Sequence, residues 1–256
     1  KLGRGHAQRP RIDYFLQNYL SARKQDEVAT AHLYTTFREY ASNGGSATDH
    51  LAMLRSYASV YQGFDSGTGG KREQLFFERI RTMEMVSVNP FVLELYVAHK
   101  SRLPEILQVL VDVESFLVRR MVCGLNTRGY NRFFVELIKK LPGDAGVAER
   151  VRAALRNSTA ASSRWPDDKE FKEAWLGKPI YEILAAARLR MLLEALEMQV
   201  RTEMTEPAPV PAKLQVEHIL PQAWKTHWAL PPDVDPEEAR QRRNVMLHTL
   251  GNLTLL

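Results

Sequence analysis

Cysteine is almost missing from this sequence, which has a single one, Cys123, among 256 residues. One cysteine can form neither an internal disulfide nor a zinc site built on a cysteine pair, and its scarcity is compatible with a reducing compartment. Long apolar runs are missing too, since no segment reaches the roughly 18 uninterrupted apolar residues of a membrane span. The polar and basic first ten residues have no apolar run behind them. The sequence therefore predicts a cytoplasmic protein without a secretion signal.

Two enzyme signatures are absent as well. The sequence has no Gly-x-Ser-x-Gly elbow. The segment Gly69-Gly70-Lys71-Arg72 resembles part of a phosphate-binding loop, but Asp65 stands where the first glycine is required and Arg72 replaces the Ser or Thr. These departures argue against nucleotide binding at this segment.

The composition that remains is that of an ordinary globular protein. Hydrophobic residues make up 45% of the chain, enough for a sizeable core in one or two domains. Lysine and arginine exceed aspartate and glutamate by 35 to 30. This mild basic excess permits nucleic-acid binding but does not argue for it, because local clustering of charge matters more than the sum.

Apolar residues recur at helical spacing over most of the chain before residue 203. Residues 103–123 carry apolar side chains around most of the helix, which predicts the central, buried helix of a domain. Asp167 and Glu170 fit a capping box at a helix start. The other predicted helices are 12–23, 27–40, 47–64, 72–85, 130–141, 146–157 and 180–201.

The amino-acid composition changes after the last of these predicted helices. Proline occupies alternate positions in Glu206-Pro207-Ala208-Pro209-Val210-Pro211, which favours an extended, semi-rigid linker. We therefore expect a helical domain over residues 1–203, a proline-rich linker over 204–212 and a small C-terminal module over 213–256. No internal repeat is visible.

Two motifs in the C-terminal module point to chemistry. Lys213 to Val216 is expected to form a short strand that presents Glu217 and His218 at its end, and Asn252 lies in a second apolar strand segment. A histidine titrating near neutrality can accept a proton from water, and a neighbouring carboxylate suits a hard ion such as Mg²⁺ or Mn²⁺. The amide of Asn252 can bond across the loop that holds the histidine.

These motifs resemble the HNH-like nuclease domain of GmrSD-type, modification-dependent restriction enzymes, which carry Glu-His-Ile-x-Pro-Gln followed by Gly-Asn-Leu-x-Leu-Leu. Residues 216–222 and 248–256 match closely, and weaker similarity runs upstream through 116–124 and 164–168. The implied fold is mainly α, with a multi-helix domain followed by a small, C-terminally incomplete ββα-metal (HNH-like) module. The implied activity is nicking or cleavage of foreign or modified DNA in bacterial phage defence.

The resemblance also implies a role for each motif residue. His218 would be the general base, Glu217 a ligand of Mg²⁺ or Mn²⁺, and Asn252 the residue that braces the hairpin, while His248 receives no role. In this family an Asn or His on a following helix completes the metal site, and an NTPase domain precedes the helical region. Neither has a counterpart in residues 1–256, so the resemblance implies a fragment that holds metal weakly or not at all.

The sequence leaves two questions open. Lys213, Arg240, Arg242 and Arg243 could contact the DNA backbone, but the three arginines fit a solvated helix face equally well. The second question is activity itself. The alternative to a nuclease is a catalytically silent helical module that binds DNA or a partner protein, with the hairpin as a structural remnant.

Overall fold

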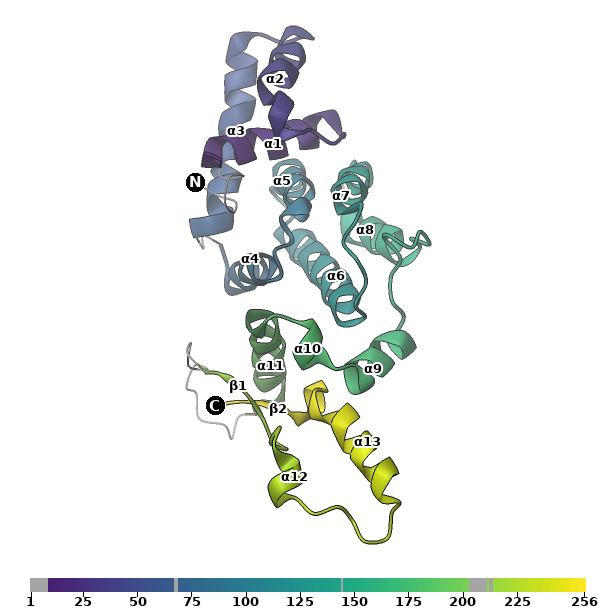
Figure 1. The fold of residues 1–256 in the computed structure, drawn as a ribbon. Coiled ribbons are helices and arrows are strands. Elements are labelled where there is room, and N and C mark those ends of the chain that lie inside the picture. The colour runs from purple at the N-terminus through teal and green to yellow at the C-terminus, as the bar shows by residue number, and fades with distance from the viewer. Residues whose placement is uncertain (1–8, 67–68, 144, 203–210, 212–213) are drawn as a thin grey trace. The chain divides into compact units, whose positions relative to one another are not determined.

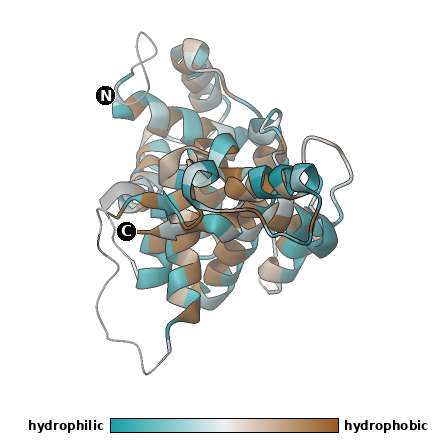
Figure 2. Ribbon diagram, turned by 60° about the horizontal axis from the view of Figure 1, so that its bottom comes forward, coloured by the Kyte–Doolittle hydropathy of each residue, from teal (hydrophilic) through white to brown (hydrophobic). Residues whose placement is uncertain are grey.

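A computed structural model describes residues 9–66, 69–143, 145–202, 211 and 214–256 (Figure 1). The described chain is mainly helical, as the sequence predicted, and its sheet consists of two short strands. The helices carry both hydrophobic and hydrophilic residues along their length (Figure 2), as helices that bury one face do. None of the helices in the described ranges is long and apolar enough to cross a membrane.

The contacts divide the chain into two compact units. The first comprises Lys1–Leu117 and Asn126–Trp165, and the second comprises Val118–Leu125 and Pro166–Leu256. This division differs from the one expected at 204–212. The helices after residue 166 fall in the same unit as the strands, and the helix at Ala186–Val200 packs on both strands. Of the proline-rich linker itself, only Pro211 lies within the described residues.

The first unit is built around a helix that the sequence analysis did not single out. This helix, α5, spans Asn89–Ala98 and contacts α1, α3 and α7. Its residues Phe91, Val92, Leu93 and Leu95 are fully buried. The unit's helices are α1 (Arg11–Lys24), α2 (Leu33–Ser42), α3 (Ala47–Ser66), α4 (Lys71–Met83), α5, α6 (Leu103–Val122, whose last residues belong to the second unit), α7 (Tyr130–Ile138) and α8 (Val147–Arg156), with short 3₁₀ turns at Thr30–His32 and Val86–Val88.

Most predicted helix boundaries in this unit are correct to within a few residues, but one is wrong. The helix expected from residue 27 begins only at Leu33. The chain leaves α1 through Gln25 in the left-handed conformation, and the side chain of Asp26 accepts a hydrogen bond from the backbone N–H of Glu27 at 2.8 Å. A side chain that bonds its neighbouring backbone in this way competes with helix formation. The helical pattern therefore starts later than its apolar periodicity suggests.

The second unit carries the strands. Helices α9 (Asp168–Gly177), α10 (Ile180–Ile183) and α11 (Ala186–Val200) precede strand β1 (Val216–His218). Helices α12 (Trp224–His227) and α13 (Pro236–Leu247), a 3₁₀ turn at Leu250–Asn252 and strand β2 (Leu253–Leu255) follow. The predicted cap of α9 is confirmed, since Asp167 accepts a hydrogen bond from the N–H of Glu170 at 2.8 Å.

The continuous helix predicted over residues 180–201 is wrong. Leu184 and Ala185 are extended, with ψ angles of 142° and 147°, so the segment divides into α10 and α11. The N–H of Tyr181, in the first turn of α10, donates to the carbonyl of His248 at 3.0 Å. Helical periodicity alone reveals neither the break at Leu184 nor this long-range bond.

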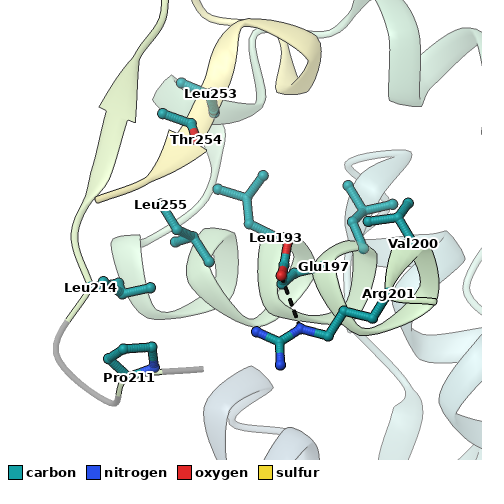
Figure 3. A pocket seen from close by; sticks show the side chains of 10 residues that line it. Leu193, Glu197, Val200, Arg201, Pro211, Leu214, Leu253, Thr254 and Leu255 are labelled. Atoms are coloured by element: carbon teal, nitrogen blue, oxygen red, sulfur yellow. Dashed lines mark hydrogen bonds and ion pairs between the residues drawn. The ribbon is translucent and has the colours of Figure 1, made fainter. Parts of the chain in front are cut away.

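Helix α11 packs on the hairpin that holds the candidate site. An open pocket of about 360 Å³ lies between them, lined by apolar side chains such as Leu193 and Leu255 together with Glu197, Arg201 and Thr254 (Figure 3). At its rim Arg201 donates to Glu197 at 2.9 Å. The apolar face of α11 thus supports one face of the hairpin.

The aromatic cluster around Phe116 gives a prediction for the stability of the first unit. Phe116 is fully buried, and its ring centroid lies 5.2 Å from that of Phe133 and 6.1 Å from that of Trp165. We expect Phe116→Ala to lower the free energy of unfolding by about 3–5 kcal/mol through lost burial and a cavity. Urea unfolding followed by near-UV circular dichroism measures the loss. Val111→Ala, at a position 42% exposed on the same helix, is the matched control, and equal midpoints for the two variants would contradict the prediction.

Candidate functional site

The hairpin aligns the two sequence motifs. Strands β1 and β2 are antiparallel, with Glu217 opposite Thr254 and His218 opposite Leu253. Backbone bonds extend the ladder at both ends, from the N–H of Gln215 to Leu256 at 2.7 Å and from the N–H of Ile219 to Asn252 at 2.8 Å. Residues far apart in the sequence are therefore fixed in one register.

Glu217 and His218 lie within β1 and not just beyond its end. The strand expected over Lys213 to Val216 is displaced, because the ladder bonds run from Gln215 to Ile219. Side chains alternate between the two faces of a strand, so Glu217 and His218 project to opposite sides. Accordingly Glu217 is exposed, whereas His218 is half-buried.

Asn252 braces the chain on both sides of the site. Its Oδ1 accepts from the N–H of Leu220 at 2.8 Å, and its Nδ2 donates to the carbonyls of Leu220 at 3.2 Å and Leu247 at 2.8 Å. The sequence analysis expected such a bond across the histidine loop, but placed Asn252 in a strand. The residue instead ends the 3₁₀ turn before β2, and this turn directs its amide toward Leu220.

The ring of His218 packs against two other rings. The ring centroid of Tyr181 lies 4.4 Å from that of His218, in an edge-on arrangement. The ring of His248 is nearly perpendicular to His218 at 5.5 Å. Tyr181 and His248 in turn stack at 5.8 Å, with 22° between their planes. The three rings of Tyr181, His218 and His248 form a ring cluster. Its members come from α10, from β1 and from the residue directly after α13.

The two ring nitrogens of His218 have different surroundings. Nε2 is buried and has no hydrogen-bond partner among the described residues. Nδ1 lies 3.4 Å from the side-chain nitrogen of Gln222, which is exposed. Nδ1 is therefore the ring nitrogen with a partner, because the exposed amide of Gln222 can donate to its lone pair.

Burial lowers the pKa of His218 below the ordinary histidine value of 6.5. The neighbouring His248 lowers it further, since two positive imidazoles repel each other, whereas the negative charge of Glu217 raises it. Burial and His248 outweigh Glu217. The imidazole thus stays neutral to a lower pH than a free histidine does.

The candidate DNA-binding residues differ in whether other groups of the chain already bind their charged side chains. Arg243 donates to the carbonyls of Trp228 at 2.8 Å and Ala229 at 2.9 Å, and its guanidinium lies over the ring of Trp224. Its charge therefore holds α13 to the segment after α12. Arg240 lies 3.5 Å from Glu237, and Arg242 is exposed. Lys213 lies outside the described residues.

Within the described ranges, no group of three or more histidine, cysteine, aspartate or glutamate residues could hold a metal ion. Glu217 supplies a single exposed carboxylate at the hairpin. The role of Glu217 as a ligand therefore stays a prediction.

Sequence reasoning missed the role of Tyr181 altogether. Nothing marks this tyrosine locally, because it reaches His218 only through the tertiary fold. Gln222 and His248 stand in the quoted motifs but received no role, and Gln222 is detectable there since it lies four residues after His218. A side chain at that spacing can return to the histidine when the chain turns, as it does here at Pro221.

The environment of His218 gives a prediction on pH. We expect the imidazole to titrate below 6.5, because burial and His248 both disfavour its charged form. Replacing the neighbouring ring in His248→Gln should raise the pKa of His218, and Glu217→Gln should lower it. NMR titration of the imidazole resonances measures both shifts. A titration at or above the ordinary value in the unaltered protein would contradict the described burial.

The bonds of Asn252 give a prediction on local stability. We expect Asn252→Ala to destabilise the hairpin by about 1–3 kcal/mol, because the variant leaves the N–H of Leu220 and two carbonyls without their partner. Asn252→Asp keeps an acceptor for Leu220 but loses the two donated bonds. Hydrogen exchange at the amide of Leu220 should therefore be fastest in the alanine variant and intermediate in the aspartate variant.

Asn244→Ala, at an exposed position on α13, is the control and should leave this exchange rate unchanged. Equal protection of Leu220 in the Asn252 and Asn244 alanine variants would show that the amide of Asn252 does not brace the loop.

A comparison with known protein families adds a second line of information. Residues 165–256 match the family model described as GmrSD restriction endonucleases, C-terminal domain. The match covers both sequence motifs and the segment from α9 to β2. The resemblance seen in the motifs is confirmed over these residues. No curated protein and no solved structure shows significant similarity to the chain.

Proposed function

We propose, from the match of residues 165–256 to the C-terminal domain of GmrSD restriction endonucleases, that this protein is a DNA endonuclease with His218 as its general base. The observation that carries the proposal is the state of His218. Burial favours its neutral form, it lies in a braced hairpin, and its Nδ1 borders the exposed side chain of Gln222. A neutral imidazole is suited to taking a proton from water.

The proposed step uses the two nitrogens of His218 differently. With its proton on the buried Nε2, the neutral ring directs the lone pair of Nδ1 toward the amide of Gln222, and the attacking water would take the place of that amide. A water molecule attacking a phosphodiester would pass its proton to Nδ1. Gln222, 3.4 Å from Nδ1, is placed to orient that water or the phosphate.

We further propose that Glu217 is a ligand of Mg²⁺ or Mn²⁺. Its carboxylate is a hard oxygen donor, and Mg²⁺ in phosphate-transfer sites is often held by one or two carboxylates together with substrate phosphates. A single exposed carboxylate fits an ion that depends on DNA for the rest of its ligands. When bound, the ion would stabilise the charge on the departing 3′ oxygen. Because Glu217 and His218 project to opposite faces of β1, the strand alone does not bring the ion and the base to one phosphate, and the bound DNA would have to reach both.

DNA is the proposed substrate, and Arg242 is the best placed of the candidate contacts in the described chain. Arg242 is exposed, whereas Arg243 is engaged with the carbonyls of Trp228 and Ala229. Arg240 remains a candidate contact to the DNA backbone, because its ion pair with Glu237 is long and exposed and therefore weak. The proposal extends, on the family match alone, to nicking of foreign or modified DNA in bacterial phage defence with an NTPase domain as partner.

A catalytically silent module that binds DNA or a protein is the second candidate. One observation favours it, which is that the described residues contain no three-residue group able to hold a metal ion. The same hairpin would then be a structural element, with Asn252 serving only stability. The two candidates differ in whether His218 matters to a chemical step.

Nicking of supercoiled plasmid by the natural full-length protein, with Mg²⁺ or Mn²⁺, separates the two candidates. We expect His218→Ala to lower the nicking rate on the order of 10²- to 10⁴-fold, the usual contribution of a general base. Glu217→Gln should also reduce the rate, and added metal should partly restore it if the carboxylate is a ligand.

His227→Ala is the matched control, because His227 is an exposed histidine of the same unit on α12. It should nick as the unaltered protein does. Plasmid binding without nicking by the folded unaltered protein would favour the silent module.

A further inference from the structure

We propose that Tyr181 and His248 are positioning residues for His218, and that their rings hold its imidazole in the one orientation that directs Nδ1 toward Gln222. This inference rests on the proposed function, since a fixed orientation matters to activity only if His218 is the base. It assigns a role to two residues outside the Glu-His pair and Asn252.

The ring cluster restricts rotation of His218. The side-chain torsion that turns an imidazole is soft and roughly two-fold, so an unsupported ring can present either a nitrogen or a carbon to the same place. Tyr181 lies against His218 at a ring distance of 4.4 Å, and His248 stands nearly perpendicular to it at 5.5 Å. Such edge-on contacts between rings are favourable, and a turned imidazole would exchange them for others.

The two neighbouring rings are themselves fixed. The backbone N–H of Tyr181 donates to the carbonyl of His248 at 3.0 Å, and the side chains of these residues stack. The Nε2 atom of His248 lies 3.5 Å from a carboxylate oxygen of Glu182. The extended residues Leu184 and Ala185 end α10 and so allow this short helix to carry Tyr181 apart from α11.

His248 is placed to support the base and not to replace it. Its Nδ1 is buried without a hydrogen-bond partner among the described residues, and its Nε2 faces Glu182. By contrast, the Nδ1 atom of His218 lies beside the exposed Gln222. Of the two imidazoles, that of His218 therefore has the acceptor nitrogen that borders an exposed side chain, and the ring of His248 packs against it.

The test compares four variants of the natural full-length protein. Tyr181→Leu and His248→Leu each remove one ring, Tyr181→Phe keeps the ring of Tyr181 without its hydroxyl, and Tyr34→Leu, the control, changes an exposed tyrosine of the first unit. The rate of plasmid nicking, plasmid binding and the nitrogen-detected NMR spectrum of the imidazole of His218 are measured for each. The spectrum is taken above the ordinary pKa of histidine and is assigned by its loss in His218→Ala.

We expect Tyr181→Leu to lower the nicking rate on the order of 10- to 100-fold, as misplacement of a catalytic group does. Plasmid binding should stay unchanged. The nitrogen shifts of His218 should move from a spectrum dominated by Nε2–H toward a mixture of the two neutral forms. Tyr181→Phe should restore both the rate and the spectrum, because the ring and not the hydroxyl does the positioning. His248→Leu should resemble Tyr181→Leu in both readouts.

Two outcomes would overturn the positioning role: an unchanged spectrum of His218 in folded Tyr181→Leu, or a loss of rate that Tyr181→Phe does not restore. The spectrum also separates this inference from the proposed function. If no form of the protein nicks DNA while the spectrum still changes with Tyr181→Leu, the nuclease proposal fails and the positioning of the ring stands. Thermal unfolding of each variant distinguishes a local change from a loss of the fold.

Discussion

The arrangement at the hairpin depends on one side-chain amide, that of Asn252. An amide has one acceptor and two donor hydrogens, and here the oxygen and the nitrogen are both used on the backbone. The bonds to Leu220 hold the loop after His218, and the bond to Leu247 holds the end of α13 just before His248. The side chain of Asn252 thereby holds both segments that carry a histidine, the one at His218 and the one at His248. An aliphatic side chain at this position could fill the space but could not satisfy these backbone atoms.

Next to Asn252, the imidazole of His218 is half-buried. Burial of an imidazole disfavours its charge, and the second imidazole at 5.5 Å adds to that effect, so the electrostatics and the packing act in the same direction. Glu217 acts against both from the other face of the strand. The environment of His218 thus combines its neighbour Glu217 in β1 with two residues distant in sequence, Tyr181 and His248.

The sequence predicted those features that local rules decide. The helical character of the chain, the cap at Asp167 and the bond of Asn252 across the histidine loop follow from periodicity, capping chemistry and a recognisable motif. The contact of Tyr181 with His218 and the engagement of Arg243 did not follow, because each depends on a partner far along the chain. Nor does proline spacing reveal which helices pack on the strands.

The register of the hairpin closes the segment between its strands into a loop, with Val216 held opposite Leu255. Closing a flexible loop costs entropy that grows only with the logarithm of its length, about 0.6 kcal/mol for each doubling. The stretch between α12 and α13 can therefore change in length at small cost, while the ladder and Asn252 keep the two ends in place. A protein built in this way can accept insertions between α12 and α13 without rebuilding the site itself.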